Sequence, residues 1–214
     1  MVSVDPPLDC QACPRLVGLR HELREQFPDW FNAPVPSFGS PDPKLLIVGL
    51  APGMRGANQT GRPFTGDYAG DLLYETMLDF GFAKGTYQAR PDDGLELRDA
   101  IITNAVRCLP PQNKPTGPEI KTCRPYLIAT LEANPGLRAV LALGRIAHET
   151  FLSALELRRA DFTFRHGARH DLGTRQLVMF DSYHCSRYNT NTGRLTTEMF
   201  RSVFTDIRQF LDCE

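Results

Sequence analysis

Short apolar runs alternate with amphipathic segments along the 214 residues of the chain. Continuous apolar runs are typical of strands buried on both faces of a sheet, and they predict strands at residues 45–49, 100–106, 139–144 and 176–184. Helical spacing of apolar residues predicts helices at 14–26, 69–81, 119–133, 146–157 and 196–211. Because strands alternate with helices, we expect a three-layer α/β/α fold around a central four-stranded parallel sheet.

One basic stretch fits neither pattern. Residues 158–174 (RRADFTFRHGARHDLGT) show little periodicity, and they indicate either a surface excursion or an edge hairpin. The chain shows no internal repeat, no low-complexity tract and no sign of a second domain. Its length suits one globular domain, so residues 1–214 are expected to form a single domain.

Charge and hydropathy exclude some classes of function. A formal net charge of −1 argues against a protein that coats nucleic acid by bulk attraction, so any DNA binding needs a local basic patch. No run approaches the roughly 18 apolar residues of a membrane helix. The start of the chain, MVSVDPPLDC, is acidic and proline-rich, unlike a signal peptide. We expect a soluble, cytoplasmic protein with no membrane partner.

Four of the six cysteines are spaced like metal ligands. Cys10 and Cys13 form a C-x-x-C pair, and fourteen residues separate Cys108 from Cys123. Without a secretion signal, reduced thiols are expected. Four thiolates complete either a tetrahedral zinc site or a cubane iron–sulfur cluster. Compact zinc modules usually have two tight pairs, so the single tight pair favours the cluster over zinc, and both over four ordinary buried thiols.

The first predicted strand is followed by a glycine-rich loop, GLAPGMRGANQTGRPFTGDYAG, at residues 49–70. It matches neither G-x-x-x-x-G-K-[ST] nor G-x-G-x-x-G, so a nucleotide-hydrolysing P-loop is not indicated. The loop is either a simple chain reversal or a hollow where a ligand approaches the backbone, and we favour the hollow. Phe64 is then positioned to stack on a flat heterocycle, with a core role as the alternative.

Two polar residues stand at the carboxyl ends of predicted strands, where α/β sheets bind ligands. Asn104 interrupts an apolar strand, and a buried amide needs a hydrogen-bonding partner. Its donor and acceptor match the O4 and N3–H of uracil and mismatch cytosine. His184 ends the last strand, where an imidazole can stabilise the negative charge of a departing base. The polar loop that follows suits a minor-groove wedge backed by phosphate contacts; its candidate DNA-binding residues are Arg187, Tyr188, Asn189 and Arg194.

With these residues in place, the sequence resembles the uracil-DNA glycosylase superfamily, specifically its iron–sulfur type 5 branch. The resemblance is carried by the C-x-x-C start, the glycine-rich loop, ITNAVRCLPPQNKP and SYHCSRYNTNTGRLT. It implies a 4Fe-4S cluster on Cys10, Cys13, Cys108 and Cys123. It also implies a monomeric DNA repair hydrolase of base excision repair, which removes uracil or other deaminated or damaged bases from DNA and leaves an abasic site.

By position, the resemblance implies a first catalytic and substrate-binding stretch that consists of Gly49, Leu50, Ala51 and Pro52. It implies that Phe64 stacks on the base, that Asn104 reads its edge and that His184 faces its O2. Leu50 and Ala51 stand where better-known branches carry an aspartate, glutamate or asparagine that handles water. Asp67 is therefore the nearest candidate to orient water or to support positive charge on the sugar.

A second departure is Cys185, which stands where the family's His-Pro-Ser has proline. We expect a more flexible loop as the consequence. Two alternatives to the glycosylase are an iron–sulfur or zinc-stabilised nucleic-acid binding module without activity, and a zinc-stabilised enzyme that acts on a small molecule in the same crevice.

Overall fold

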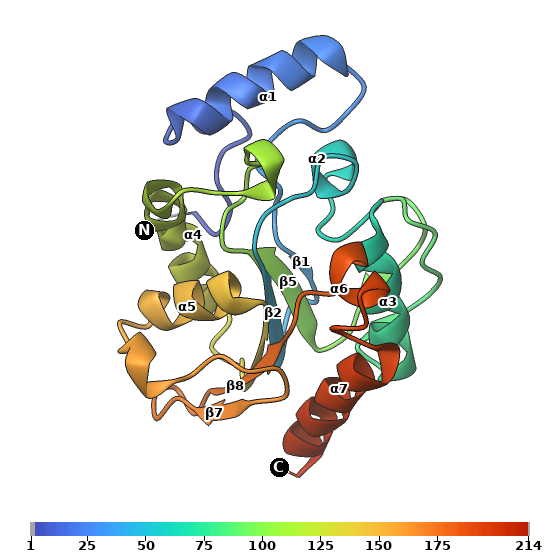
Figure 1. The fold of residues 1–214 in the computed structure, drawn as a ribbon, viewed down its shortest axis with the longest axis vertical. Coiled ribbons are helices and arrows are strands. Elements are labelled where there is room, and N and C mark those ends of the chain that lie inside the picture. The colour runs from blue at the N-terminus through green and yellow to red at the C-terminus, as the bar shows by residue number, and fades with distance from the viewer. Residues whose placement is uncertain (1–2, 214) are drawn as a thin grey trace.

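The computed structural model describes residues 3–213 and has a central sheet with helices on both faces (Figure 1). The sheet has six strands in the order β1-β5-β2-β6-β8-β7. Their bounds, in that order, are Phe38–Gly39, Ala100–Asn104, Leu45–Gly49, Ala139–Leu143, Val178–Ser182 and Arg169–Asp171. A separate two-stranded ladder joins β3 (Ala83–Lys84) to β4 (Glu96–Leu97).

The four central strands, β5, β2, β6 and β8, run parallel, whereas β1 and β7 pair antiparallel at the two edges. The predicted α/β fold with four parallel strands is therefore confirmed, and the sheet is larger than predicted by two edge strands. Each edge strand has only two or three residues, which is too short for a hydrophobic alternation to be visible. The basic stretch 158–174 contains one of them, β7, as the edge-hairpin interpretation required.

Helices form the two outer layers of the fold. In Figure 1, α4 (Gly117–Ala133) and α5 (Arg145–Ala154) lie on one side of the sheet, and α3 (Tyr68–Asp79) and α7 (Thr197–Asp212) lie on the other. Alternate residues of β2 point into the two hydrophobic cores between these layers. The remaining helices are α1 (Pro14–Gln26), α2 (Ala57–Thr60) and α6 (Arg187–Asn191), with 3-10 turns at Pro111–Asn113 and Arg159–Asp161. Within residues 3–213, none of the helices combines the length and the apolar character needed to cross a bilayer.

Side-chain caps begin four of the helices, α3, α4, α6 and α7, and fix where the preceding loops end. Thr116 accepts a hydrogen bond from the backbone N–H of Glu119, whose carboxylate accepts one from the N–H of Thr116, so α4 begins with a capping box. Asp67 caps α3 by accepting from the N–H of Gly70 at 3.3 Å. This second cap holds the end of the glycine-rich loop next to the carboxyl ends of the strands.

Candidate active site

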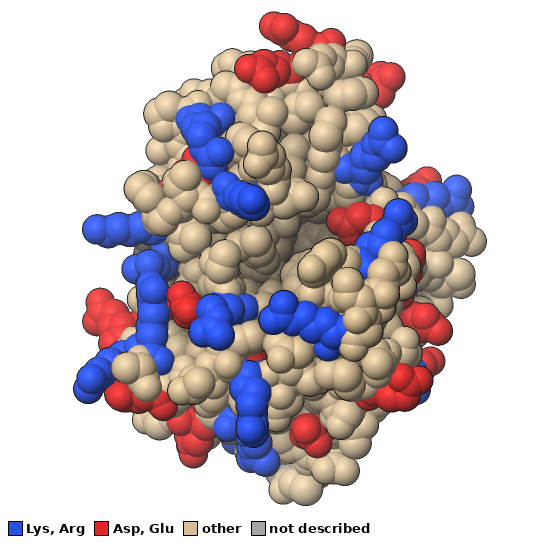
Figure 2. Space-filling model, in the orientation of Figure 1, with Lys and Arg blue, Asp and Glu red and all other residues tan. Residues whose placement is uncertain are grey.

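A cavity of about 710 Å³ opens where the parallel strands end. Its wall is formed by residues that follow β2, by the last residue of β5 and by residues that follow β8, and Figure 2 shows a hollow at the centre of this face. The structure brings most of the predicted site residues to this cavity. Those that line it are Leu50, Ala51, Pro52, Phe64, Asp67, Asn104, His184 and Arg187.

Gly49 lies beneath the cavity, at the end of β2 and in register with Asn104 of β5. A Cβ atom at Gly49 would come within 3.0 Å of both the Asn104 side-chain oxygen and the ring of Phe64. Contacts that short do not occur, so any larger residue here would displace the two side chains. Gly49 therefore makes room for the amide and the aromatic ring that meet over it.

Gly53 and Gly56 have the same relation to Asp67. A Cβ atom at either glycine would come within 3.0 Å of the Asp67 carboxylate. The sequence-based expectation was that the loop loses side chains to admit a ligand against its backbone. Gly53 itself lines the cavity, and the structure adds a second reason: these glycines also make room for the protein's own catalytic candidates, which face the cavity.

Asn104 carries a fully buried polar atom that the described residues leave without a partner. It is 3% exposed, and its side-chain oxygen has no hydrogen-bonding partner within residues 3–213. Leaving a buried acceptor unsatisfied costs about 1–3 kcal/mol. A ligand that donates an N–H group at this point would remove that cost.

Phe64 is held in an unusual backbone conformation beside Asn104. Its φ angle is 52°, in the left-handed region that non-glycine residues rarely adopt. Two tyrosine hydroxyls hold this turn: Tyr87 donates to the carbonyl oxygen of Phe64 at 3.2 Å, and Tyr74 donates to that of Pro63 at 2.6 Å. The Phe64 ring lies 5.9 Å from the ring of His184, with 28° between the planes.

His184 is a neutral imidazole in this environment. Burial lowers its pKa to about 4, because a low-dielectric surrounding disfavours the charged form. Its ring makes no hydrogen bond with any described residue, so one N–H is available for a ligand. Asn189 donates from its side chain to the backbone oxygen of His184 at 2.8 Å. The Asn189 amide is thus used inside the loop and positions His184.

Asp67 is half-buried at the cavity wall, and burial raises the pKa of its carboxyl group, an effect that backbone hydrogen bonds from Gly70 and Ala69 oppose. The neighbouring Cys185 is fully buried, and its thiol donates to the carbonyl oxygen of Ala69 at 3.4 Å. This contact ties the loop to the start of α3, and the expected greater flexibility at Cys185 stays a prediction.

The remaining DNA-binding candidates lie on and after α6. Arg187 lines the cavity, and its guanidinium group lies 5.4 Å from the ring centre of Tyr68. Tyr188 is 72% exposed, and Arg194 lies with its guanidinium group 4.7 Å from the ring centre of Tyr183. These side chains are accessible at the rim, where a nucleic acid would approach.

The four predicted metal ligands also come together. Cys10, Cys13, Cys108 and Cys123 line one small cavity of about 20 Å³ that joins the start of α1 to the segment after β5 and to α4. Burial raises the pKa of Cys108 to about 12 and that of Cys123 to about 11.

Cationic and donor groups surround these sulfur atoms. Arg20 lines the same cavity and donates to the Cys108 sulfur at 4.0 Å, and the backbone N–H of Arg107 donates to the Cys123 sulfur at 3.3 Å. The Nε atoms of both arginines are buried and have no partner within residues 3–213. Such surroundings fit a negatively charged group bound by thiolates.

The spacing of the four cysteine sulfur atoms helps to distinguish a zinc ion from an iron–sulfur cluster. A tetrahedral zinc ion with Zn–S bonds of ~2.3 Å places its sulfurs about 3.8 Å apart. Within residues 3–213, no three of these cysteines have sulfur atoms that all lie within 4.8 Å of one another. Because a cubane binds each cysteine through a different iron atom, the wider arrangement fits a cluster better than a single zinc ion.

One part of the site was not predicted. Arg62 forms a bidentate, buried ion pair with Asp93 at 2.8 and 2.7 Å and also donates to Thr65 at 2.7 Å. These bonds, together with the two tyrosine hydroxyls, hold the turn that carries Phe64. The sequence contains no signal that links two residues 31 positions apart through a loop, so only the fold reveals this pair.

Comparison with known proteins agrees with this geometry. A family model described as the uracil DNA glycosylase superfamily matches residues 36–208. The chain is 44% identical over 207 residues to the type-5 uracil-DNA glycosylase of Thermus thermophilus. The matched region covers 94% of this chain and 93% of that protein. It is 42% identical to the type-5 uracil-DNA glycosylase of Mycobacterium leprae (94% and 90% covered) and 39% identical to that of Pyrobaculum aerophilum (92% and 86%). The type-4 enzyme of Sulfurisphaera tokodaii is more distant, at 29% identity (79% and 72%). The chain therefore belongs to the uracil DNA glycosylase superfamily and to its type-5 group.

Proposed function

We propose that this protein removes uracil from DNA by hydrolysing the N-glycosidic bond and leaves an abasic site for base excision repair. The observation that carries the proposal is the buried, unpartnered oxygen of Asn104 in a cavity that Phe64 and His184 also line. Relatives that are named for this activity match nearly the whole chain.

Base recognition begins with a nucleotide that has left the duplex stack, which costs a few kcal/mol and costs least at a mismatch such as U·G. The base then stacks on Phe64. Asn104 accepts from N3–H of uracil and donates to O4, whereas cytosine presents an acceptor at N3 and a donor at N4. This reversed pattern leaves the Asn104 oxygen unsatisfied, so cytosine is disfavoured.

Bond cleavage leaves the electron pair on the base as the C1′–N1 bond breaks. The neutral His184 donates its N–H to O2, where negative charge develops, and a well-placed donor of this kind contributes about 2.7–4 kcal/mol in comparable sites. Because His184 is already neutral, no cationic imidazole has to lose a proton to the surrounding protein during the reaction. The sugar is left with positive charge at C1′.

Water then attacks C1′, and its proton needs an acceptor. The cavity wall contains two carboxylates, Asp67 and Asp71. Asp71 is exposed, whereas Asp67 is half-buried and held by the backbone at the start of α3. Asp67 is therefore the group that supports the positive sugar, orients the water and accepts its proton, since Leu50 and Ala51 have no polar side chain. The uracil anion takes up one proton when it leaves as free uracil, so the step balances.

A 4Fe-4S cluster is the proposed occupant of the cysteine cavity, held by Cys10, Cys13, Cys108 and Cys123. When bound, it supplies a cross-link rather than redox chemistry, because hydrolysis transfers no electrons. It would join the start of α1 to the loop after β5, which follows directly from Asn104. All candidate residues of the reaction line one cavity of one chain, so we propose a single-domain monomer as the active form.

The competing function is a nucleic-acid binding module without activity, favoured by the apolar side chains of Leu50 and Ala51. Incubation of the purified protein with uracil-bearing DNA, followed by alkali treatment, separates the two. Alkali-labile sites at the uracil positions are expected. Tight binding to the DNA without such sites would instead favour the binding module.

A further inference from the structure

The basic stretch 158–174 has no role in the reaction described above and does not line the cavity, but it pairs with the strand that leads to His184. The backbone N–H of Gly167 donates to the carbonyl oxygen of Asp181 at 2.9 Å. The N–H of Asp181 in turn donates to the carbonyl oxygen of Ala168, also at 2.9 Å. Asp181 belongs to β8, three residues before His184. The stretch is thus fastened along the strand that leads into the site.

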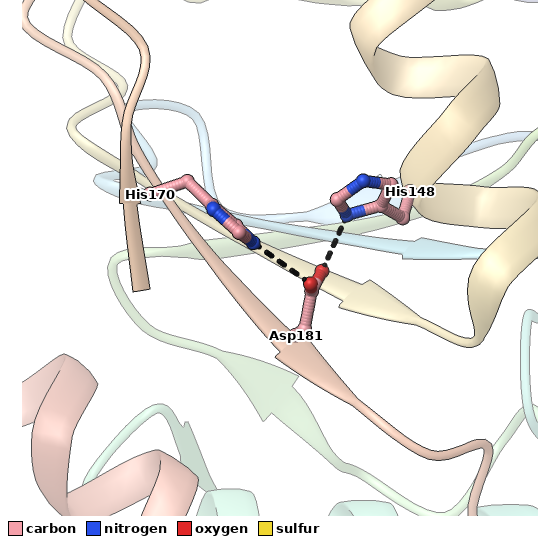
Figure 3. Close-up of side chains that lie close together, drawn as sticks. All are labelled: His148, His170 and Asp181. Carbon is pink, nitrogen blue, oxygen red and sulfur yellow. Dashed lines mark hydrogen bonds and ion pairs between the residues drawn. The ribbon is translucent and has the colours of Figure 1, made fainter. Parts of the chain in front are cut away.

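A buried side-chain cluster strengthens this attachment (Figure 3). The Asp181 carboxylate is bonded to His148 of α5 at 2.7 Å and to His170 of β7 at 3.0 Å, and the other ring nitrogen of His148 is bonded to the carbonyl oxygen of Phe162 at 2.9 Å. The backbone N–H of Arg165 lies 3.4 Å from the same carboxylate. Although the three ligand atoms lie within 4.8 Å of one another, they already bond to each other, so we interpret the cluster as a clasp.

Arginines stacked on aromatic rings cover the outer side of this clasped region. The guanidinium group of Arg145 lies 5.5 Å from the ring centre of Phe164, and that of Arg194 lies 4.7 Å from the ring centre of Tyr183. The Phe164 and Tyr183 rings are themselves 6.2 Å apart. Tyr183 directly precedes His184, so this row of rings and cations borders the candidate active site.

These arginines have no acidic partners. Within residues 3–213, Arg145, Arg165 and Arg194 are exposed and form no ion pair. By contrast, Arg158 and Arg159 of the same basic stretch pair with Asp161 at 3.9 Å and with Glu149 at 3.6 Å. Figure 2 shows Lys and Arg side chains directly below the hollow. Exposed cations that form no ion pair near a nucleotide site are complementary to the negative charge of DNA phosphates.

We propose that Arg145, Phe164, Arg165, Tyr183 and Arg194 form a second DNA-contact surface, which we call the basic–aromatic patch. It holds backbone phosphates that flank the extruded nucleotide, in addition to the contacts of α6. The aromatic rings and the clasp fix the cations in place, so less side-chain entropy is lost on binding. This proposal rests on the proposed function, because it assumes that DNA is the substrate.

The test compares two arginines of the same basic stretch. Arg165→Ala removes an unpaired cation, and Arg159→Ala removes a paired one as the matched control. Binding to a U·G duplex of about 20 base pairs is measured between 50 and 200 mM salt in the His184→Ala background, which is expected to slow turnover by about 10²–10³-fold. Arg165→Ala is expected to weaken binding about threefold to tenfold and to reduce the salt slope by about 0.9, whereas Arg159→Ala stays near the parent protein.

Equal affinity and an equal salt slope for Arg165→Ala and Arg159→Ala would overturn the patch. Arg165→Lys keeps the charge and should retain the parental slope, and melting curves check that each variant is folded. Failure of the proposed function has a different signature: the otherwise unmodified chain would yield no alkali-labile sites, while the Arg165 and Arg159 variants would still differ in binding.

Discussion

The base cavity and the cysteine cavity both bury ionisable groups, but the two sites use different protonation states of those groups. In the open base cavity of about 710 Å³, burial lowers the pKa of His184 to about 4. In the enclosed cysteine cavity of about 20 Å³, burial raises the pKa of Cys108 to about 12. Each shift favours the neutral form of its group.

The difference lies in which form each site uses. In our proposal the base cavity uses the neutral form directly, since a neutral imidazole donates to a departing base and needs no resident counterion. In our proposal the cysteine cavity uses the charged thiolates, for which a bound metal group would replace the lost hydration. The proposed base site would thus exchange its ligand at each turnover, whereas the proposed cluster would stay bound as part of the fold.

The largest effect that tests this comparison is expected from His184→Ala. Loss of the donor to O2 should lower single-turnover excision of uracil from a U·G duplex by about 10²–10³-fold, with little change in the melting temperature. His21→Ala, on the exposed face of α1, is the matched control. Wild-type rates in His184→Ala would remove His184 from the reaction.

The next effect concerns Asp67, whose pKa is raised by burial above its ordinary value of 3.8. If the ionised carboxylate acts on water and sugar, the excision rate falls as the pH drops through this raised pKa. Asp67→Asn should be about 10²-fold slower at neutral pH and should lack that acid limb, which single-turnover rates across the pH range will show. Asp71→Asn, an exposed carboxylate on the same wall, should keep both the rate and the limb. The same acid limb in Asp67→Asn would point to another group.

Cys108→Ala addresses the closed cavity. Removal of one of four ligands should lower the iron content and reduce the melting temperature by about 10 °C, since several kcal/mol shift a chain of this size by roughly 2–4 °C each. The choice between uracil and cytosine should not change. Cys213→Ala, at an exposed cysteine outside the cavity, should leave iron and melting temperature unchanged. Zinc without iron in the wild-type protein would contradict the cluster.

The smallest effect is expected from Cys185→Ala, which belongs to neither cavity's chemistry. Loss of its weak hydrogen bond to Ala69 should cost about 1 kcal/mol and lower the melting temperature by about 2–4 °C. Excision at saturating DNA should stay within about twofold. A large loss of excision with an unchanged melting temperature would mean that the thiol takes part in the site itself.

Strands, helices and ligand types were predictable because they depend on local pattern. Buried runs such as 45–49 are apolar throughout, and the helix at 14–26 has exactly the predicted bounds. Asn104 was recognisable as a candidate because an amide in an apolar strand conflicts with its surroundings. Edge strands β1 and β7 were not predictable, since two or three residues hold no period.

The order of residues along the chain thus specified the α/β/α class, the C-x-x-C pair and the polar groups at the strand ends, since each depends on residues near one another in sequence, whereas the fold brought that pair to Cys108 and Cys123. Long-range packing specified the rest. It showed that Gly49, Gly53 and Gly56 clear space for the protein's own side chains. It also paired Arg62 with Asp93 and, within residues 3–213, left the Arg165 side chain without an ion pair. Such relations depend on distances between atoms that only a folded chain brings together.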